Sequence, residues 1–520
     1  MWYGPGMFRR FRHWLDTLRL RRAARHARRR PETSRVIVGS TGSGKSEGEL
    51  ADLARLAERR DYALVLLDGH GPLAFRAGGH WISRGHEARL VYEQLSATDR
   101  VLCWPMLTRS LSVSPSLRRI EDAQTRDEVT QSFLSYRNVA SLTDRPWTKE
   151  WLEAAIDLCL SQPEPQPLPA ILSAFHPGSP EYRRLLLNSD RHALVEKFRG
   201  LERLKRRNEV QYESVVGAAR RLIEPVCDSE VVRLRSRPGP FDWSGALRDR
   251  RLIVFDGGGI RSTEVKRTLF LLVSVQVIHA VRRHFADRQQ PLPVVVVLEE
   301  AGAMGLVTPF VLLALKELRK AGLAIHLITQ STLDFADPAT FELLLSGTPW
   351  QAWYQSLAPA DQEIGARALA NATFDPLSVH FVRNRTVAAG SHRVETSSHG
   401  KSYDAHHRLL RVDRRAVTGH VTAYKNIAEP SYKSPQLHEQ MYRTRLATLR
   451  IGERLVRERG GVRCERVRRL TELRGFDRLT RAGIARVRQA PIYLPPEQLP
   501  LAADPPVLLD AAQRLGAGGG

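Results

Sequence analysis

The sequence predicts an α/β fold with a mostly parallel sheet, and three observations support this prediction. Short runs of Val, Ile and Leu without polar alternation are typical of strands covered on both faces. Segments with helical periodicity lie between several of these runs, at residues 47–60, 264–283 and 309–320. A glycine-rich phosphate-binding motif directly follows the first run. The predicted strands are residues 35–38, 62–67, 252–255, 294–298 and 324–328, with a further candidate at 350–354.

The overall composition is that of a globular protein. Of the 520 residues, 42% are hydrophobic and 26% are charged, which excludes a wholly disordered chain. The longest uncharged apolar stretch, residues 268–280, is shorter than the roughly 20 residues that span a bilayer. We therefore expect no transmembrane helix, and the basic N-terminus does not resemble a secretory signal. The four cysteines are scattered, so neither a disulfide framework nor a structural zinc site is predicted.

The net charge of +23 is concentrated in two flanking regions. Residues 1–30 carry a net charge of +9 and residues 381–490 carry +15, whereas residues 31–380 carry only +1 and residues 491–520 carry −2. Such segregation favours contact with a polyanion over a general role in solubility.

The first basic flank has the pattern of an amphipathic helix at residues 7–30. Aromatic and leucine side chains recur there at intervals of three and four residues, and arginines fill most other positions. Such a helix can lie on an anionic membrane, bind nucleic acid or dock on the body of the same protein. Periodicity does not distinguish these surfaces.

The pattern along the chain predicts five regions. Between the second and third predicted strands, about 180 residues intervene, far more than one crossover connection needs. Their periodicity is helical, which indicates an insertion. The predicted regions are a basic amphipathic helix at 1–34, an α/β core at 35–105 and 236–372, an inserted all-α subdomain at 106–235, a basic and mainly helical region at 373–490, and a Pro/Gly-rich tail at 491–520 that we expect to be disordered.

The phosphate-binding motif predicts nucleoside triphosphate binding. It fits the pattern G-x-x-x-x-G-K-[ST] and stands between a predicted strand and a predicted helix, as a phosphate loop requires. Backbone N–H groups of the loop would surround the phosphates, the lysine would reach the β and γ oxygens, and the final serine hydroxyl would ligate Mg²⁺. We therefore expect ATP and Mg²⁺ as cofactors. The motif consists of Gly39, Ser40, Thr41, Gly42, Ser43, Gly44, Lys45 and Ser46.

Three predicted strands end in acidic residues that compete for the metal-binding and water-activating roles. Asp68 and Asp256 each stand alone before glycine-rich turns. Only the fourth strand offers two consecutive acids, Glu299 and Glu300. One acid can hold the metal while the next polarises the attacking water as general base. The pair therefore predicts Glu299 as a metal ligand and Glu300 as the catalytic base.

Two further residues are candidates for sensing or stabilising the γ-phosphate. Gln330 ends the strand that follows the acidic pair, where its amide can sense the phosphate or orient water. Arg319 lies near the end of the intervening helix. It can neutralise transition-state charge on a neighbouring subunit's nucleotide, or it can serve only as a helix-end cation favoured by the helix dipole.

Taken in order, these motifs resemble the FtsK/HerA superfamily of ring-forming motors, and within it the type IV secretion coupling proteins of the TraG/TraD class. The resemblance covers about residues 35–372. Besides the phosphate loop and the helical insertion, it rests on the LLDGHGPL segment at 66–73, the acidic pair, the RKAG segment at 319–322 and the TQS segment at 329–331.

The resemblance implies a RecA-like core that carries an all-α domain and assembles as a hexamer. Hydrolysis of ATP between subunits would drive DNA, single- or double-stranded, through a central channel. The family's trans-acting arginine would fall on Arg319 and its γ-phosphate-sensing glutamine on Gln330. Two features depart from the family pattern: Glu299 stands where the family usually has Asp, and the usual N-terminal transmembrane anchor is not found.

These arguments together predict an ATP-hydrolysing DNA translocase or coupling-type motor that acts in conjugative, type IV secretion-like transfer. We expect it in the cytoplasm, with possible peripheral contact to the inner face of the cell membrane or a secretion channel through residues 7–30. Two alternatives remain open at this stage. One is an ATPase that energises protein secretion or pilus assembly, and the other is a nucleotide-gated scaffold that does not hydrolyse ATP.

Overall fold

The computed structural model describes most of the chain and divides it into two compact units. The larger unit contains the described residues up to Gly365 and those from Arg445 onward, and the smaller unit is Ala366–Thr444. The described residues are 12–22, 32–110, 114–134, 146–335, 338–374, 379–403, 409–432, 434–458 and 461–498.

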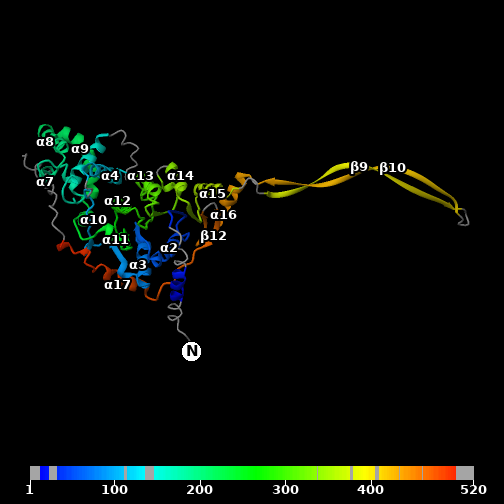
Figure 1. Ribbon diagram of the computed structural model, residues 1–520, viewed down its shortest axis with the longest axis horizontal. Coiled ribbons are helices and arrows are strands. Elements are labelled where there is room, and N and C mark those ends of the chain that lie inside the picture. The colour runs from blue at the N-terminus through cyan, green and yellow to red at the C-terminus, as the bar shows by residue number, and fades with distance from the viewer. Residues whose placement is uncertain are drawn as a thin grey trace, which may run out of the picture. The chain divides into compact units, whose positions relative to one another are not determined.

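The larger unit is built on a nine-stranded sheet (Figure 1). Its strands are β1 (Arg35–Val38), β2 (Ala63–Asp68), β3 (Leu90–Gln94), β5 (Leu252–Asp256), β6 (Val294–Leu298), β7 (Leu323–Thr329), β8 (Trp350–Tyr354), β11 (Glu453–Glu458) and β12 (Gly461–Arg466). They lie in the order β12-β11-β8-β1-β7-β6-β2-β5-β3. The seven strands from β8 to β3 are parallel, and β11 and β12 extend the sheet in antiparallel pairing. The predicted α/β class with a mostly parallel sheet is confirmed.

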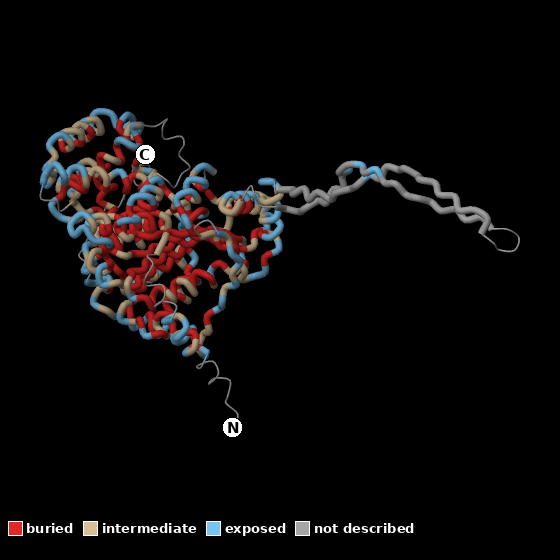
Figure 2. Tube along the Cα trace, turned by 45° about the vertical axis from the view of Figure 1, so that its right-hand side comes forward, coloured by how far each residue is buried: buried red, intermediate tan, exposed pale blue. Residues whose placement is uncertain are grey.

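The predicted strands form the buried centre of this sheet. All residues of β1, β2, β5, β6, β7 and β8 are buried, as expected for continuous apolar runs covered on both faces (Figure 2). Because the strands are parallel and in register, their carboxyl ends meet at one edge of the sheet. The residues that follow β1, β6 and β7 are therefore brought to the same edge.

Helices of the larger unit connect the strands. Expected helices 47–60, 264–283 and 309–320 correspond to α2, α12 and α13, with ends shifted by up to five residues. The helices outside the insertion are α2 (Lys45–Arg59), α3 (Pro72–Ser83), α12 (Thr263–Arg288), α13 (Pro309–Glu317), α14 (Pro338–Gly347), α15 (Pro359–Thr373), α16 (Pro435–Thr448) and α17 (Phe476–Val487). Among the described helices, α12 alone is long and apolar enough to cross a membrane, and 61% of its most apolar window is buried inside the protein, as in a core helix.

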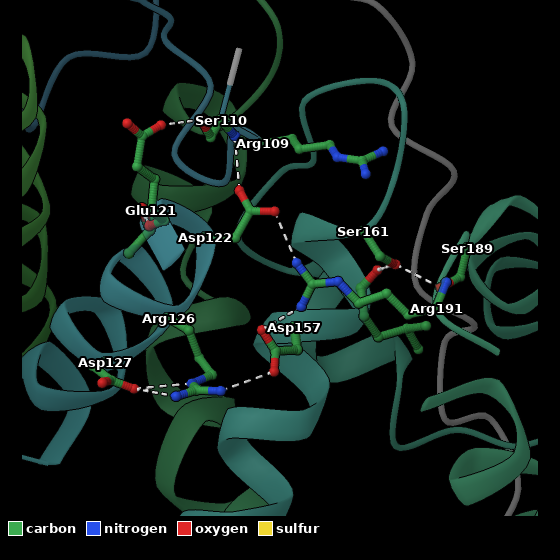
Figure 3. Close-up of polar contacts among 12 residues, drawn as sticks. Arg109, Ser110, Glu121, Asp122, Arg126, Asp127, Asp157, Ser161, Ser189 and Arg191 are labelled. Atoms are coloured by element: carbon green, nitrogen blue, oxygen red, sulfur yellow. Dashed lines mark hydrogen bonds and ion pairs between the residues drawn. The ribbon is translucent and has the colours of Figure 1, made fainter. Parts of the chain in front are cut away.

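Between β4 (Val101–Leu102) and β5 the chain forms a group of helices that are joined by buried ion pairs. Arg191, before α8, donates to Asp122 of α4 and to Asp157 of α5, both at 2.8 Å (Figure 3). Arg126 of α4 donates to the other oxygen of Asp157 at 3.1 Å. One shared carboxylate thus connects three segments of the insertion. Its helices are α4 (Pro115–Leu134), α5 (Pro146–Leu160), α6 (Ala170–Ser173), α7 (Pro180–Asn188), α8 (His192–Arg207), α9 (Glu209–Cys227), α10 (Glu230–Arg235) and α11 (Trp243–Arg248).

Strand β3 was not predicted, and a buried ion pair explains why. Its Glu93 interrupts what would otherwise be an apolar run, and the Arg235 side chain donates to Glu93 at 2.6 Å. Both side chains are 0% exposed. Burial raises the pKa of Glu93, and Arg235 opposes that rise. The pair joins the last helix of the insertion to the edge of the sheet.

We expect Arg235→Ala to destabilise the larger unit strongly. Removing one partner leaves Glu93 buried without its counter-charge, a change that typically costs about 3–5 kcal/mol. Thermal unfolding followed by circular dichroism should therefore move to lower temperature. Arg207→Ala, at an exposed position at the end of α8, is the matched control and should melt like the wild type. Equal melting temperatures for the Arg235 variant and the control would contradict this account of the pair.

The expectation that residues 373–490 are mainly helical is wrong. The region contains β9 (Val379–Tyr403), β10 (Leu409–Tyr432), β11 and β12, alongside helices α16 and α17. The many charged residues hid these strands, because only three of the six residues of β11 are buried and none of β12 is. Residues 491–498, expected within a disordered tail, contain β13 (Tyr493–Leu494), which pairs with β4. Residues 499–520 of that tail lie outside the described residues.

The smaller unit is dominated by one long antiparallel hairpin of β9 and β10 (Figure 1). The two strands pair from Val379↔Tyr432 to Tyr403↔Leu409, with irregularities in the register near Tyr424 and at both ends. The segments that flank the hairpin are tied together by Thr373, whose hydroxyl lies 3.0 Å from both His438 Nε2 and Tyr442 Oη.

The N-terminal amphipathic segment is helical at residues 12–22, the part of 7–30 that is described. This helix docks on the larger unit. Asp16 accepts hydrogen bonds from the hydroxyl and N–H groups of Thr471, at 2.7 and 3.3 Å, and Arg21 donates to Glu58 of α2 at 3.1 Å. Of the three surfaces left open by the sequence, the body of the same protein therefore receives this helix, although Trp14 and Leu18 remain exposed.

Candidate nucleotide-binding site

The phosphate-binding motif forms the loop between β1 and α2, at the carboxyl edge of the sheet. Gly44 precedes α2 with a left-handed backbone, φ +99°, a conformation that favours glycine. A side chain there would also collide with another backbone, because an added Cβ would lie 2.9 Å from the Cα of Gly452. The strand, the loop and the helix thus have the arrangement that the motif predicts.

The predicted phosphate-binding lysine is folded against its own loop. The Lys45 ammonium donates to the carbonyl oxygens of Gly39 and of Ser40, the latter at 3.0 Å. Burial lowers the pKa of Lys45, while the nearby carboxylates of Glu299 and Glu300 raise it. The amine is therefore held at the centre of the loop, where it can exchange carbonyl partners for phosphate oxygens.

A chain of hydrogen bonds joins the loop to the catalytic acid candidate. The Thr41 hydroxyl donates to Gln330 Oε1, and Gln330 Nε2 donates to Glu300 Oε1, both at 2.5 Å. These three residues follow β1, β7 and β6, which are neighbours in the sheet. The structure thus brings together the phosphate loop, the predicted sensor and the predicted base.

Glu300 has an unusual backbone. Its φ of +56° is left-handed, which is uncommon for a residue with a side chain and costs of the order of 1 kcal/mol or more. Gln330 holds its carboxylate from one side. The strain persists because the surrounding structure fixes the turn, in which the N–H of Ala301 donates to the carbonyl of Ile328 at 2.8 Å.

Glu299 is buried beside the loop with part of its carboxylate unsatisfied. Its side chain is 7% exposed, and Oε2 has no hydrogen-bond partner. Burial, followed by repulsion from Asp68 and Glu300, raises the pKa of Glu299 to about 8. A divalent cation would supply the missing positive charge, and oxygen donors such as this carboxylate and the Ser46 hydroxyl suit Mg²⁺. Both residues line the same pocket, so they fit the predicted metal.

Asp68 and Asp256, the competing acids, have structural partners. Asp68 accepts hydrogen bonds from the N–H groups of His70 and Ala74, at 2.9 and 2.8 Å, and so caps the start of α3. Asp256 accepts from Gly258 N–H at 2.8 Å and from the Tyr92 hydroxyl at 2.7 Å. Neither lines the pocket at the phosphate loop. This geometry favours the consecutive pair over the two single acids.

The pocket that these groups share has a volume of about 560 Å³. The sequence did not predict one of its walls, which comes from residues more than 400 positions beyond the phosphate loop. No motif marks these residues. This wall consists of Ile451, Gly452, Arg466, Val467 and Arg469, and we call it the C-terminal wall.

Arg319 is not part of this pocket. Helix α13 ends at Glu317, and Arg319 lies exposed in the turn that leads into β7. That turn is at the amino end of β7, whereas the phosphate loop lies at the carboxyl edge, because β1 and β7 are parallel and in register. Within one chain, Arg319 is therefore on the edge of the sheet opposite to the pocket.

No protein-family model matches the chain, and a search of curated proteins finds no match. Solved structures do match. The bacterial conjugative coupling protein TrwBdeltaN70, in a trigonal form with sulphate, superimposes with a TM-score of 0.53 at 13% identity, covering 88% of this chain and 93% of that chain. TrwB with the non-hydrolysable ATP analogue ADPNP gives a TM-score of 0.52 at 13% identity, covering 87% and 92%. The chain therefore has the RecA-like P-loop fold of this coupling protein.

Proposed function

We propose that the protein is an ATP-hydrolysing DNA translocase, a motor of the coupling type. The observation that carries this proposal is the hydrogen-bonded chain from Thr41 through Gln330 to Glu300 beside the phosphate loop. It connects the groups that would bind, sense and attack the γ-phosphate. The fold shared with TrwB, a conjugative coupling protein, supports the same class of motor.

Each residue of the pocket has a distinct role in this proposal. Lys45 and the loop N–H groups bind the phosphates, and Glu300 accepts a proton from the attacking water as general base. Gln330 donates to Glu300, which orients the carboxylate and links it to the loop. Ser46 and Glu299 hold Mg²⁺, which when bound polarises the phosphate oxygens as a Lewis acid.

A hexamer explains the position of Arg319. Because this arginine is exposed at the edge opposite to its own pocket, it can reach a nucleotide only on a neighbouring subunit. In a ring, each pocket would then receive the arginine of the next subunit, where the positive charge stabilises the transition state. The resemblance to ring-forming motors supports this assignment.

The basic hairpin is the part of the chain that best suits DNA. Its two strands contain eight Lys or Arg residues against three Asp or Glu residues. An isolated two-stranded ribbon is marginally stable in water, so a partner surface would stabilise it. DNA offers the complementary negative charge, and a two-stranded ribbon fits the major groove of a duplex. An ATPase for protein secretion would share the pocket but respond to a protein partner and not to DNA.

In the cell, the motor would act in the cytoplasm at the inner face of the membrane, in conjugative transfer. Residues 7–30 would provide the peripheral contact with the membrane or with a secretion channel. Within this segment, the exposed Trp14 and Leu18 are the described apolar side chains available for such contact.

We expect removal of the hairpin to weaken DNA binding without stopping basal ATP hydrolysis. Residues 375–433 can be replaced by a short Gly-Ser linker, because Phe374 and His438 at the two ends are in ring contact at 5.9 Å. Binding of labelled DNA should weaken, and the log–log dependence on salt should become shallower by about 0.9 for each lost contact on duplex DNA.

A second variant separates charge from shape. Replacing the eight basic residues of β9 and β10 with glutamine keeps the ribbon length and should produce the same loss of affinity and salt dependence. Unchanged affinity and slope in both variants would exclude the hairpin as the DNA site. ATP hydrolysis without DNA serves as the folding control for each.

A further inference from the structure

The C-terminal wall reaches the phosphate loop because of the antiparallel strands at the sheet edge. β11 pairs with β8 in antiparallel register, with Arg454 opposite Tyr354. The start of β11 therefore lies at the carboxyl edge of the parallel strands. β12 returns antiparallel to β11, so its end lies at the same edge. Both connections, at residues 450–453 and 466–469, are thus brought beside the phosphate loop.

Backbone hydrogen bonds fix this wall to the loop. The N–H of Gly452 donates to the carbonyl of Ser43 at 2.9 Å, and the N–H of Val467 donates to the carbonyl of Gly452 at 2.7 Å. Gly452 has a left-handed φ of +80° and approaches Gly44 so closely that a Cβ on Gly44 would not fit. The two connections therefore form one layer on the loop.

The wall covers the side of the pocket away from the catalytic acid. Glu300 and Gln330 contact the loop at Thr41, near its start. The wall instead contacts its end and the first turn of α2, since a Cβ added to Gly48 would lie 3.3 Å from Val467 Cγ2. In a phosphate loop the catalytic groups meet the γ-phosphate, so the nucleoside extends from the other end of the phosphate chain.

The side chains of the wall suit a nucleotide. Ile451 is 74% exposed, although it is large and apolar, and Val467 lies beside it in the pocket lining. Arg469 is 3.8 Å from Glu47, which already pairs with Arg76. Among the described residues, Arg466 has no carboxylate within ion-pair distance. The wall thus presents an uncovered apolar surface next to an arginine whose charge is not neutralised.

We propose that the C-terminal wall is the nucleoside subsite of the nucleotide pocket. Ile451 and Val467 contact the face of the base, and Arg466 contacts the phosphate chain of the same nucleotide. This inference rests on the proposed function, since it takes the pocket to bind ATP. It adds residues of the C-terminal region to a site that was built from the phosphate loop and the strand ends, and it places them in the same chain as the loop.

The test is equilibrium binding of ATP and of inorganic tripolyphosphate to the full chain, each measured by calorimetry. Ile451→Asn should weaken ATP binding about tenfold, because an apolar contact of this size is worth about 1.5 kcal/mol or more, and should leave tripolyphosphate binding unchanged. Arg466→Ala should weaken both probes about tenfold, because a hydrogen bond to a charged group contributes about 1.5–3 kcal/mol. The different response to the two probes is the signature of the subsite.

Matched controls show whether these effects are local. Leu187→Asn alters an equally exposed apolar residue in the insertion, and Arg474→Ala removes an exposed arginine that does not line the pocket. Both should bind ATP like the wild type. Wild-type affinity in Ile451→Asn and Arg466→Ala, while Lys45→Ala loses ATP, would overturn the subsite and leave the proposed function intact. Absence of ATP binding in the wild type would instead overturn the proposed function.

The tripolyphosphate probe also tests the assignment within the wall. Loss of tripolyphosphate affinity in Ile451→Asn would show that this residue supports the phosphate loop, which would contradict its contact with the base. Unchanged tripolyphosphate affinity in Arg466→Ala would contradict its contact with the phosphates. Melting temperatures of all variants distinguish either result from a loss of folding.

Discussion

Glu300→Gln is expected to lower the turnover number for ATP by about 10²- to 10⁴-fold, the usual contribution of a general base. Glutamine keeps the size of the side chain and can still pair with Gln330, but it cannot accept the proton of the attacking water. ATP affinity should change little, because Lys45 and the loop N–H groups that bind the phosphates are untouched. Phosphate release and ATP binding, measured on the same preparation, check the two expectations.

Glu317→Gln is the matched control for this substitution. It removes one carboxylate at the exposed end of α13, outside the pocket, and should hydrolyse ATP at the wild-type rate. Wild-type turnover in Glu300→Gln would remove this residue from the role of base. A joint loss of binding and turnover would indicate that Glu300 mainly supports the loop through the Gln330 and Thr41 hydrogen bonds.

Lys45→Ala should weaken ATP binding about 10- to 100-fold, since hydrogen bonds to charged groups contribute about 1.5–3 kcal/mol. Turnover at saturating ATP should fall further, because the same ammonium stabilises charge that develops in the transition state. The amine is already positioned in the structure, where it donates to Gly39 and Ser40 of the loop. Nucleotide titration and steady-state hydrolysis measure the two effects separately.

The control for Lys45 is Lys316→Ala, which removes an exposed amine from α13. Its ATP affinity should equal that of the wild type. If Lys45→Ala binds ATP as tightly as this control, the loop does not bind the phosphates in the expected way. A lowered melting temperature in Lys45→Ala would reveal the contribution of its carbonyl contacts to folding, and binding would then be compared at a lower temperature.

The central strands and the phosphate loop could be predicted because local chemistry determines them. A strand buried on both faces requires continuous apolar residues, which marks β1, β2, β5, β6 and β7 directly. The loop requires Gly44 for a left-handed turn and Lys45 for phosphate charge. The consecutive acids Glu299 and Glu300 could likewise be placed at the carboxyl end of a parallel strand. Their meeting with Gln330 follows from strand order.

The elements at the sheet edges could not be predicted in the same way. In β3, the polar Glu93 is buried only because Arg235, some 140 positions later, neutralises it. In β11, half of the residues remain partly exposed, so no apolar run marks the strand. The C-terminal wall depends on the register of β11 with β8, which brings Ile451 and Arg466 to a loop near the start of the chain. Such contacts depend on tertiary pairing, and no local pattern encodes them.

Locating the charge also changes what the basic flanks indicate. Part of the N-terminal flank docks on the larger unit, where Asp16 and Arg21 form hydrogen bonds with it. The C-terminal flank divides into the hairpin and a segment that completes the nucleotide pocket. The hairpin therefore becomes the main candidate for DNA, while the segment after it belongs to the ATPase core. Deleting residues 381–490 as a block would remove both functions together.

The most direct test of the proposed motor is the steady-state rate of ATP hydrolysis by the wild-type chain, with and without single- or double-stranded DNA, at two salt concentrations. We predict that at least one form of DNA raises the rate and that higher salt reduces this stimulation, because binding releases counterions from the phosphates. A rate that is the same with and without DNA at both salt concentrations would contradict a DNA-translocating motor.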